Sequence, residues 1–479
     1  MYIAKLLLLL LLSFSISFNV SAGLTKEKRP NILFIMIDDL RVELGAYGAP
    51  HIQSPNIDAL ANSGTRFDKA YVSVPVCGAS RASLATGMRP LPDRFRTYYS
   101  SVDKETPEAV TLFEHFKDNG YFTEGYGKIF HQMRDTEQRS WSAGKVWNWR
   151  GVSPYKDYQL AENIAQVKAS KRGPATEMFD GPDNAYLGGK LADKTINTMT
   201  KLAKKDQPFF LAVGFTKPHL PFNAPKKYWD LYDPSKFVLP YDTDNSNPRG
   251  NLPKGAPSTA YHNYGELRNG YSDTPQEGPV DEELARRLIH GYHAAVSYTD
   301  AQVGKIFAKL DALGLRDNTV VVLMGDHGYI LGEHGLWCKH STFDLATRTP
   351  LIIRAPNMPA KQTVEGLVEF IDIFPTLTDL ANISTPDQAV GMSLVKLLAD
   401  DSVPAKPAVF TRYHAAEAIR TDQYTFTQWF WNNNQKGPRM LYDNVNDPNE
   451  TQNLADMPEY KAVVKDLSGQ LAAYMKTRK

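Results

Sequence analysis

The stretch NILFIMI at residues 31–37, which Asp38 and Asp39 follow directly, decides the fold of this chain. A continuous run of apolar side chains predicts a strand that is buried on both faces, as in a parallel sheet. The site of such a sheet lies outside the carboxyl ends of its strands. We therefore expect Asp38 and Asp39 to face a crevice at one edge of a central sheet.

Strand-like segments alternate with segments of helical periodicity along the rest of the chain. Further buried, apolar strands are expected at residues 209–215, 319–324 and 351–354. Apolar residues recur at helical spacing, beside proline or glycine boundaries, at residues 55–64, 107–119 and 281–313. Because strands and helices alternate, we predict an α/β fold in which helices cover both faces of a mostly parallel sheet.

Two long segments break this alternation. Residues 140–189 and residues 239–280 are rich in Gly, Pro, Asn and Tyr. Long irregular segments inside a compact domain usually serve a function. We therefore expect both segments to form walls of a substrate cleft.

The chain changes character near residues 400–406. Beyond this point residues 424–431 alternate in the manner of a strand, and a helix is expected from about Pro458. We predict two folded units, a catalytic domain at residues 23–402 and a smaller antiparallel α+β subdomain at residues 403–479.

The N-terminus has the features of an export signal. Lys5 precedes a leucine run at residues 6–12, and the small residues 20–22 (VSA) form a cleavage pattern. A membrane anchor is less favoured, because the strongly apolar part is shorter than the roughly 20 residues of a bilayer span. We predict a signal peptide at residues 1–22 and an exported protein, periplasmic or secreted, that has no membrane contact after cleavage.

The composition excludes several classes of protein. The 479 residues include 54 basic and 53 acidic side chains, a net charge of +1, so there is no overall electrostatic signature for binding nucleic acid or an anionic membrane. Hydrophobic residues make up 42% of the chain, which excludes wholesale disorder. Two cysteines are too few for a disulfide scaffold.

Acidic residues follow two of the expected strands. Asp38 and Asp39 follow the first strand, and Asp326 and His327 come shortly after the third. One carboxylate at such a place could cap a helix, but two clusters at parallel strand ends converge more naturally on a cation. Oxygen ligands suit Ca²⁺ or Mg²⁺, and a histidine among them would also suit Zn²⁺ or Mn²⁺.

A second constellation is CGASRASLATG at residues 77–87. Small, helix-compatible residues place Cys77 near a helix N-terminus, where free amides and the helix dipole favour an anion. Arg81 comes four residues later, on the same face of that helix. Taken alone, these residues leave two alternatives open. Cys77 could be a buried cysteine at a packed helix end, or it could form a disulfide with Cys338.

This segment resembles the formylglycine signature of type I sulfatases, Cys-x-(Pro or Ala)-Ser-Arg, here CGASR. Other landmarks of that family follow in the same order. They are IDD at residues 37–39, SPNIDALA at 54–61, GKIFH at 127–131, KPH at 217–219, GDHG at 325–328, Lys339, and LYD, DPNE and NL within 441–454. The runs FFLAVGFTKPHLPF and DHGYILGEHGLWCK place the resemblance in the iduronate-2-sulfatase-like branch. It extends from about Pro30 to about Ala455.

The resemblance implies an alkaline-phosphatase-like fold and one metal centre. A maturase would oxidise Cys77 to Cα-formylglycine, whose hydrate attacks the sulfur of the substrate. One calcium ion would be held by Asp38, Asp39, Asp326, His327 and the modified Cys77. The cation would offset charge on the sulfate oxygens and help to ionise the hydrate.

The resemblance also implies roles for residues outside the metal centre. Arg81 would brace the formylglycine, and Lys128 and Lys339 would bind sulfate oxygens. His131 would take a proton from the remaining hydroxyl so that sulfate is expelled, and His219 would protonate the leaving sugar oxygen. Taken alone, Lys128 and His131 are i, i+3 neighbours only if their segment is helical, and the run around His219 could be an ordinary loop turn.

The implied activity is a sulfuric ester hydrolase that acts on a sulfated carbohydrate, such as a uronic acid 2-O-sulfate or an algal glycan. One alternative is an alkaline-phosphatase-superfamily phosphoesterase, which would need a Thr or Ser nucleophile and two metal ions. Another is an exported glycan-binding protein with a dead site, which the retained Cys77 and Arg81 argue against. Further substrate walls are expected around Arg420 and residues 429–431, where aromatic rings could stack on sugars or pack within the subdomain.

Overall fold

The computed structural model describes residues 29–143, 147–149, 155–240, 252–431 and 435–478, and the structural statements below concern these residues. The predicted signal peptide lies outside them. No helix among the described residues combines the length and the apolar character that crossing a bilayer requires.

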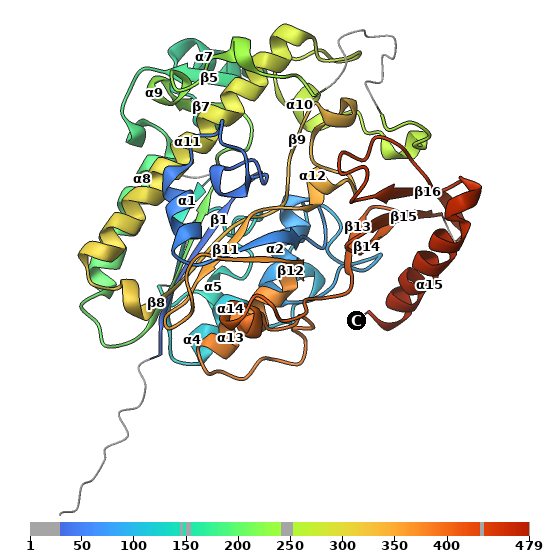
Figure 1. Cartoon of the computed structure of the whole chain (residues 1–479). Helices are drawn as coiled ribbons and strands as arrows, with labels where there is room; N and C mark the ends of the chain where they lie inside the picture. The colour runs from blue at the N-terminus through green and yellow to red at the C-terminus, as the bar shows by residue number, and fades with distance from the viewer. Residues whose placement is uncertain (1–28, 144–146, 150–154, 241–251, 432–434, 479) are drawn as a thin grey trace, which may run out of the picture.

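An eight-stranded sheet forms the centre of the molecule (Figure 1). Its strands are β1 (Asn31–Ile37), β2 (Thr65–Tyr71), β3 (Phe122–Gly127), β4 (Trp147–Asn148), β6 (Phe209–Phe215), β8 (Thr319–Gly325), β11 (Leu351–Arg354) and β12 (Gln362–Glu369). They lie in the order β12-β2-β11-β8-β1-β6-β3-β4. Only β11 runs antiparallel to its neighbours. The predicted mostly parallel sheet is therefore confirmed.

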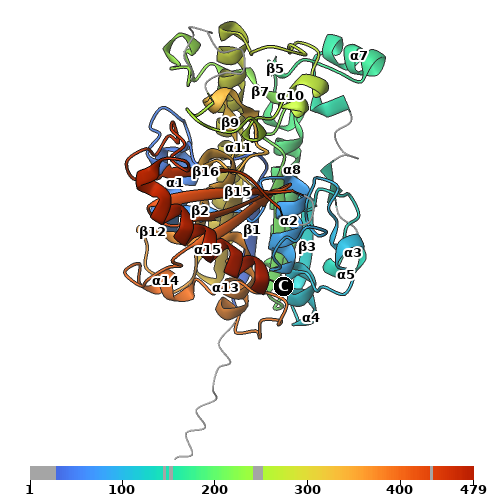
Figure 2. The same ribbon diagram turned by 90° about the vertical axis from the view of Figure 1, so that its right-hand side faces the viewer.

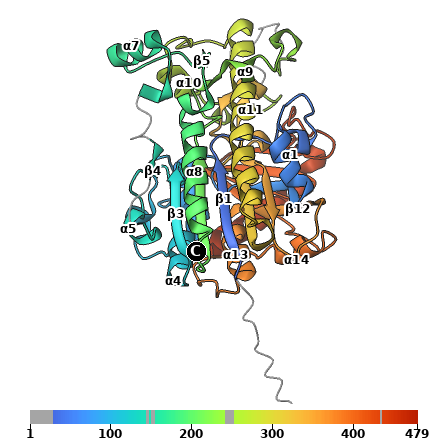
Figure 3. The ribbon, with the colours of Figure 1, turned by 90° about the vertical axis from the view of Figure 1, so that its left-hand side faces the viewer.

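Helices cover both faces of this sheet, because the side chains of each strand point alternately to the two sides. Leu33 and Ile35 of β1 pack into one hydrophobic cluster, and Phe34 and Met36 pack into the other. The helices of the first face are α1 (Pro55–Asn62), α8 (Leu187–Leu202) and α11 (Glu282–Ala312). Figure 3 shows α8 and α11 lying along the sheet. The helices of the second face are α2 (Cys77–Thr86), α4 (Leu112–Asp118), α13 (Ile373–Leu380) and α14 (Val395–Ala399).

The helix ends follow local capping. Asp281 caps α11, because its side chain accepts a hydrogen bond of 2.8 Å from the amide of Leu284. The helix expected from residue 107 begins only at Leu112. Thr111 forms a capping box with Glu114, which fixes the start of α4 five residues later than expected.

The two irregular segments contain several short elements. The first segment contains α7 (Ala161–Ser170) and β5 (Thr176–Phe179), and the second contains α10 (Gly265–Gly270). Further short elements lie elsewhere outside the main sheet, namely α3 (Val102–Glu105), α5 (Glu137–Ser140), β7 (Phe222–Pro225), α9 (Lys226–Trp229), β9 (Ile330–Leu331), β10 (Trp337–Cys338) and α12 (Asp344–Thr347). Figures 1 and 2 show α7, α10, β5 and β7 beyond the carboxyl ends of the parallel strands. Part of the second segment, residues 241–251, lies outside the described residues.

A four-stranded antiparallel sheet forms the C-terminal part of the chain. Its strands are β13 (Val409–Tyr413), β14 (Ala416–Arg420), β15 (Tyr424–Phe430) and β16 (Lys436–Asp443), which pair in chain order. Helix α15 (Lys461–Thr477) packs on this sheet (Figure 2) through Leu467 and Leu471, which contact Phe426 and Leu441 in one cluster. The predicted antiparallel α+β subdomain is confirmed, and its boundary at residue 403 stays a prediction.

Replacing Gly214 with alanine should destabilise the fold. A Cβ atom at Gly214 would lie 2.2 Å from the carbonyl carbon and oxygen of Lys128, which are backbone atoms and cannot rotate away. We expect Gly214→Ala to lower the free energy of unfolding by about 1–3 kcal/mol. The matched control is Gly469→Ala in α15, where a new Cβ meets no atom within 4 Å. Helix propensity should make that change neutral or slightly stabilising. Urea unfolding of both variants measures the difference, and equal stability of the two would contradict this explanation.

Candidate active site

The predicted site residues meet because three parallel strands end at the same level. Ile37 of β1 is paired with Phe215 of β6 and with Gly325 of β8. The backbone ladder continues one step further, since the Asp38 amide donates to the carbonyl of Phe215 at 3.0 Å. The amide of Asp326 likewise donates to the carbonyl of Ile37 at 3.2 Å. The side chains just after these strands therefore converge.

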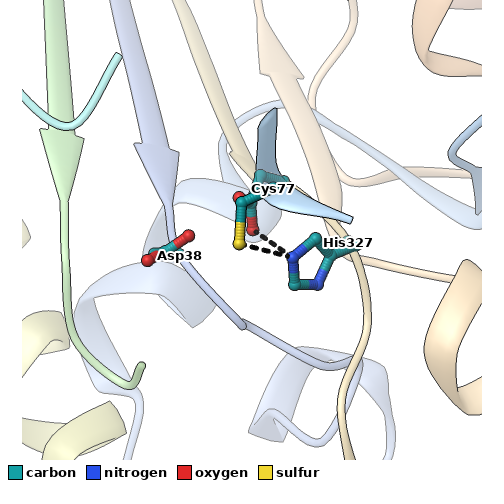
Figure 4. A group of neighbouring side chains, drawn as sticks. Asp38, Cys77 and His327 are labelled. Carbon is teal, nitrogen blue, oxygen red and sulfur yellow. Dashed lines mark hydrogen bonds and ion pairs between the residues drawn. The ribbon is translucent and has the colours of Figure 1, made fainter. Parts of the chain in front are cut away.

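The predicted metal ligands form one buried cluster. Ligand atoms of Asp38, Cys77, Asp326 and His327 lie within 4.8 Å of one another, and Figure 4 shows three of these side chains together. His327 Nδ1 is 2.9 Å from the carbonyl of Gly328, which indicates that Nδ1 carries the proton and leaves Nε2 as an acceptor. His327 Nε2 lies 3.1 Å from Cys77 Sγ.

Asp39 completes the cluster from the same strand end. Its Oδ1 atom lies 3.5 Å from His327 Nε2, and its backbone amide donates to Asp326 Oδ1 at 3.1 Å. The hydroxyl of Tyr292, on α11, donates to the carbonyl of Asp39 at 2.8 Å. The four residues expected to bind a cation are thus brought together around Cys77.

Arg81 is buried, with 1% of its surface exposed, and it joins two of these carboxylates. Its Nε donates to Asp326 Oδ2 at 2.8 Å and one terminal nitrogen donates to Asp38 Oδ1 at 3.0 Å. A further hydrogen bond goes to the carbonyl of Lys128. Burial would lower the pKa of Arg81, but Asp326 and Asp38 raise it, so the guanidinium stays charged.

Two lysines approach the cluster from other elements. Lys128 directly follows β3 and its Nζ donates to Asp38, while Lys339 directly follows β10 and its Nζ lies 2.9 Å from Asp39 Oδ1. Burial opposes the charged form of both lysines, but the neighbouring carboxylates raise the pKa of each, so both remain ammonium groups. The two buried ammonium groups can therefore bind an anion at this place.

His219 lies in the turn after β6 and faces the same centre. Ligand atoms of Asp38, Asp39, Cys77 and His219 lie within 4.8 Å of one another. His219 Nδ1 is 2.6 Å from the carbonyl of Leu220, and its Nε2 is 2.9 Å from a carboxylate oxygen of Glu266. Both neighbours can only accept, so both are satisfied when each ring nitrogen carries hydrogen.

Glu266 is a site residue that sequence reasoning missed. It lies on α10, within the second irregular segment, and its carboxylate lies 2.9 Å from both His219 Nε2 and Lys339 Nζ. Burial would raise the pKa of Glu266, but Lys339 and then His219 hold it well below its usual value. The only signal in the sequence was the expectation that this segment forms a wall of the cleft.

His131 lies at the edge of the site. The segment from Lys128 to His131 is a series of bends rather than a helix, so the helical i, i+3 interpretation is wrong. The His131 ring lies 5.9 Å from the ring of Tyr98 and 6.3 Å from that of Trp149. Lys128 Nζ also lies over the Trp149 ring at 5.1 Å. Trp149 belongs to the first irregular segment, residues 140–189. This part of the segment therefore lies beside the buried Lys128.

Cys77 occupies the first turn of α2, as expected. Burial, followed by the charge of Asp38, raises the pKa of its thiol well above the usual value, so the unmodified group is a neutral thiol at neutral pH. Cys77 and Cys338 are both free, and the disulfide alternative is therefore wrong.

Comparison with known proteins identifies the family. The sulfatase family model matches residues 30–383. The chain belongs to the sulfatase family, and it is a sulfuric ester hydrolase. A second family model, described as the C-terminal part of N-sulphoglucosamine sulphohydrolase, matches residues 332–477 of this sulfatase.

Individual relatives support the predicted branch. The sulfatase is 31% identical to iduronate 2-sulfatase of Mus musculus over 88% of this chain and 84% of the relative. It is 29% identical to an ulvan-active sulfatase of Formosa agariphila, over 92% of this chain and 80% of that protein. Among solved structures, a phosphonate monoester hydrolase from Silicibacter pomeroyi has a TM-score of 0.76 at 22% identity, with 94% of this chain and 96% of that chain covered. That last likeness concerns the fold alone.

Arg81 should be essential to the stability of this sulfatase. Removing one partner from a buried ion pair leaves uncompensated charge, a cost of about 3–5 kcal/mol. We expect Arg81→Met to lower the free energy of unfolding by that amount, because Asp38 and Asp326 would lose their shared cation. Lys69→Met is the control. It removes an exposed partner of Asp422, and it should change stability by less than about 1 kcal/mol. Denaturant unfolding tests both, and a small effect of Arg81→Met would contradict the role assigned to the guanidinium.

Proposed function

We propose that this sulfatase removes sulfate from a sulfated carbohydrate through a formylglycine at residue 77 and one calcium ion. The observation that carries the proposal is the convergence, at one helix N-terminus, of Cys77 with buried carboxylates, His327 and two buried lysines. A maturase would first convert Cys77 to the aldehyde. The hydrated aldehyde offers a hydroxyl where the thiol now lies.

The charge of the site suits a divalent cation. The ionisable groups joined in this network are the carboxylates of Asp38, Asp39, Asp326 and Glu266 and the cationic groups of Arg81, Lys128 and Lys339. When these groups are ionised and His219, paired with Glu266, carries the proton that its role as the acid requires, the network is neutral, and a divalent ion would add two positive charges. Such a site attracts a sulfate monoester, which carries one negative charge. Oxygen-rich ligands of this kind suit calcium, which would stabilise charge on the sulfate oxygens.

Lys128 and Lys339 would hold the sulfate group. Each ammonium group has three hydrogens; Lys128 already donates to Asp38, and Lys339 donates to both Asp39 and Glu266. The remaining hydrogens can bind sulfate oxygens. This arrangement places the sulfur next to residue 77, and orientation of this kind lowers the barrier to attack.

His219 would donate the proton that the leaving sugar oxygen needs. The proton would come from Nε2, whose hydrogen Glu266 accepts at 2.9 Å here and which would pass to the sugar oxygen when the substrate binds. His131, from the other side, would take a proton from the second hydroxyl of the hydrated residue 77 so that sulfate is expelled. A hydroxyl of the hydrated residue 77, ionised by loss of its proton to water, would form the new bond to sulfur, the bond from sulfur to the sugar oxygen would break, and that oxygen would leave with the proton from His219.

A cavity of 320 Å³ beside Lys339 supports a carbohydrate substrate. It is lined by His340 and Ser341, which directly follow Lys339, and by residues of the C-terminal sheet. Trp429 and Trp431 also line it, and 43% of the Trp431 surface is exposed. Aromatic rings with one free face can pack against sugar rings. The relatives named for iduronate and ulvan make a uronic acid 2-O-sulfate or an algal glycan the first substrates to test.

The same reasoning favours a sulfatase over the phosphoesterase alternative. Both possible metal groups around the site share Asp38 and Cys77, so in the described part of the chain they define one centre rather than two. Export to the periplasm or the medium, which residues 1–22 predict, would bring the protein into contact with such glycans.

The test is sulfate release from defined sulfated oligosaccharides after co-expression with a maturase. We expect the peptide that contains residue 77 to have the mass of the aldehyde, and calcium removal to abolish activity. Cys77→Ser is the matched variant. It should fold normally, because serine is close in size to cysteine, yet release almost no sulfate. An active protein whose Cys77 is entirely unmodified thiol would refute the formylglycine mechanism, and inactivity on every sulfated sugar despite full conversion would refute the substrate class.

The roles of His219 and His131 can be separated by comparing substrates that have different leaving groups. A sugar alkoxide needs a proton in the transition state, an effect typically worth about 10²–10⁴-fold, whereas an aryl sulfate leaves as a stabilised phenolate. His219→Ala should therefore reduce kcat on a sulfated sugar far more than on an aryl sulfate. His131→Ala should slow both substrates alike, because it acts on the step that releases sulfate. Equal losses on both substrates for His219→Ala would show that His219 is not the acid.

A further inference from the structure

A second group of metal-ligating side chains lies outside the active site. Glu43 lies in the loop after β1, His51 lies in the turn before α1, and His293 lies on α11. One carboxylate oxygen and one nitrogen of each imidazole lie within 4.8 Å of one another. The proposed sulfatase mechanism uses none of the three.

Both imidazoles approach the same atom. His51 Nε2 is 2.7 Å from Glu43 Oε1, and His293 Nε2 is 3.6 Å from that same oxygen. The other oxygen, Oε2, lies 3.3 Å from Arg41 Nε, and Arg41 is itself paired with Glu333 at 2.7 Å. Arg41 thus orients the carboxylate so that Oε1 faces the two histidines.

His293 is the side chain that an ordinary ion-pair cluster does not explain. It is 3% exposed; its Nδ1 has no hydrogen-bond partner, and its Nε2 has only the 3.6 Å contact with Glu43, which is too long for a hydrogen bond. A buried imidazole left in this state is costly, and most buried polar groups in proteins are satisfied. Burial also lowers the pKa of His293, which leaves the neutral form that binds metals. A cation placed between Glu43, His51 and His293 would give one ring nitrogen of His293 a partner.

The donor set identifies the class of ion. Two imidazoles and one carboxylate are a known zinc ligand set in which a fourth position stays open to water. Calcium and magnesium take oxygen ligands instead. A cavity of 590 Å³, lined by Glu43, His51 and His293 together with Tyr232 and Phe237, leaves room for that water.

We propose that Glu43, His51 and His293 bind one zinc ion, or a divalent transition metal of similar preference, at a site separate from the catalytic centre. The ion would tie the loop after β1 to α11. The neighbouring residue on that helix, Tyr292, already binds the carbonyl of Asp39 and the amide of Arg41 at 2.8 and 3.0 Å. The site would therefore stabilise the loop that carries Asp38 and Asp39, and it does not depend on the substrate proposed above.

The test must keep zinc out of the active site. The full chain with Cys77→Ala and His327→Ala lacks the sulfur and nitrogen ligands there, and excess calcium would occupy the remaining carboxylates. Equilibrium dialysis with Zn²⁺ should then give one zinc per chain. Co²⁺ should give visible d–d bands without a thiolate charge-transfer band. Added zinc should raise the Tm of this protein, because it binds only the folded state.

Three further variants in the same background decide the assignment. His293→Ala and His51→Ala should each weaken zinc binding by roughly 100-fold and remove the Tm shift, because each loses one of three protein ligands. His51 has a half-exposed side chain, so its variant remains informative if His293→Ala fails to fold. The matched control is His290→Ala, one turn earlier on α11. The His290 ring contacts the carbonyl of Trp229 at 2.8 Å and not the proposed zinc site, so this substitution should leave zinc binding unchanged. No zinc bound in the background protein, or equal affinity in His51→Ala and His290→Ala, would overturn the proposal.

Discussion

The site depends on one buried arginine. Three parallel strands end at one level and bring carboxylates together inside the protein, where their mutual repulsion and desolvation oppose folding. Arg81 offsets this by donating to both Asp38 and Asp326 from within α2. Ser80, beside it, donates to the backbone carbonyl of Asp326 at 2.5 Å. These contacts fix the N-terminus of α2 against the strand ends, and the position of Cys77 follows from them.

The sequence predicts the frame of the site well, because each part of that frame leaves a local signal. Apolar runs reveal the buried strands, and the carboxylates that follow them have to lie at the same edge of the sheet. Cys77 is visible through the small residues after it. The formylglycine signature and the ordered landmarks were needed to give roles to Lys128, Lys339 and His219. Singly, none of these residues differs in pattern from an ordinary surface side chain.

Two of the parts that were missed or wrong have no such signal. Glu266 sits in a segment without periodicity, and it reaches His219 and Lys339 only through tertiary packing. The direction of β11 is set by its pairing with β8 and β2, which a strand of four residues does not encode locally. The start of α4 depended on a capping box at Thr111, a local signal that the proline at residue 107 obscured.

The carboxylate cluster and the residues proposed to contact the sugar have different structural origins. Asp38 and Asp326 directly follow strands whose residues are all buried, whereas Glu266, Trp149 and Trp429 come from the irregular segments and from the C-terminal sheet. A substitution in the close-packed core disturbs many neighbouring side chains, whereas a substitution in a surface loop disturbs few. Selection can therefore exchange the walls that we propose to contact the sugar and leave the carboxylate cluster intact. One scaffold can in this way pass from one glycan to another during evolution without losing its reaction.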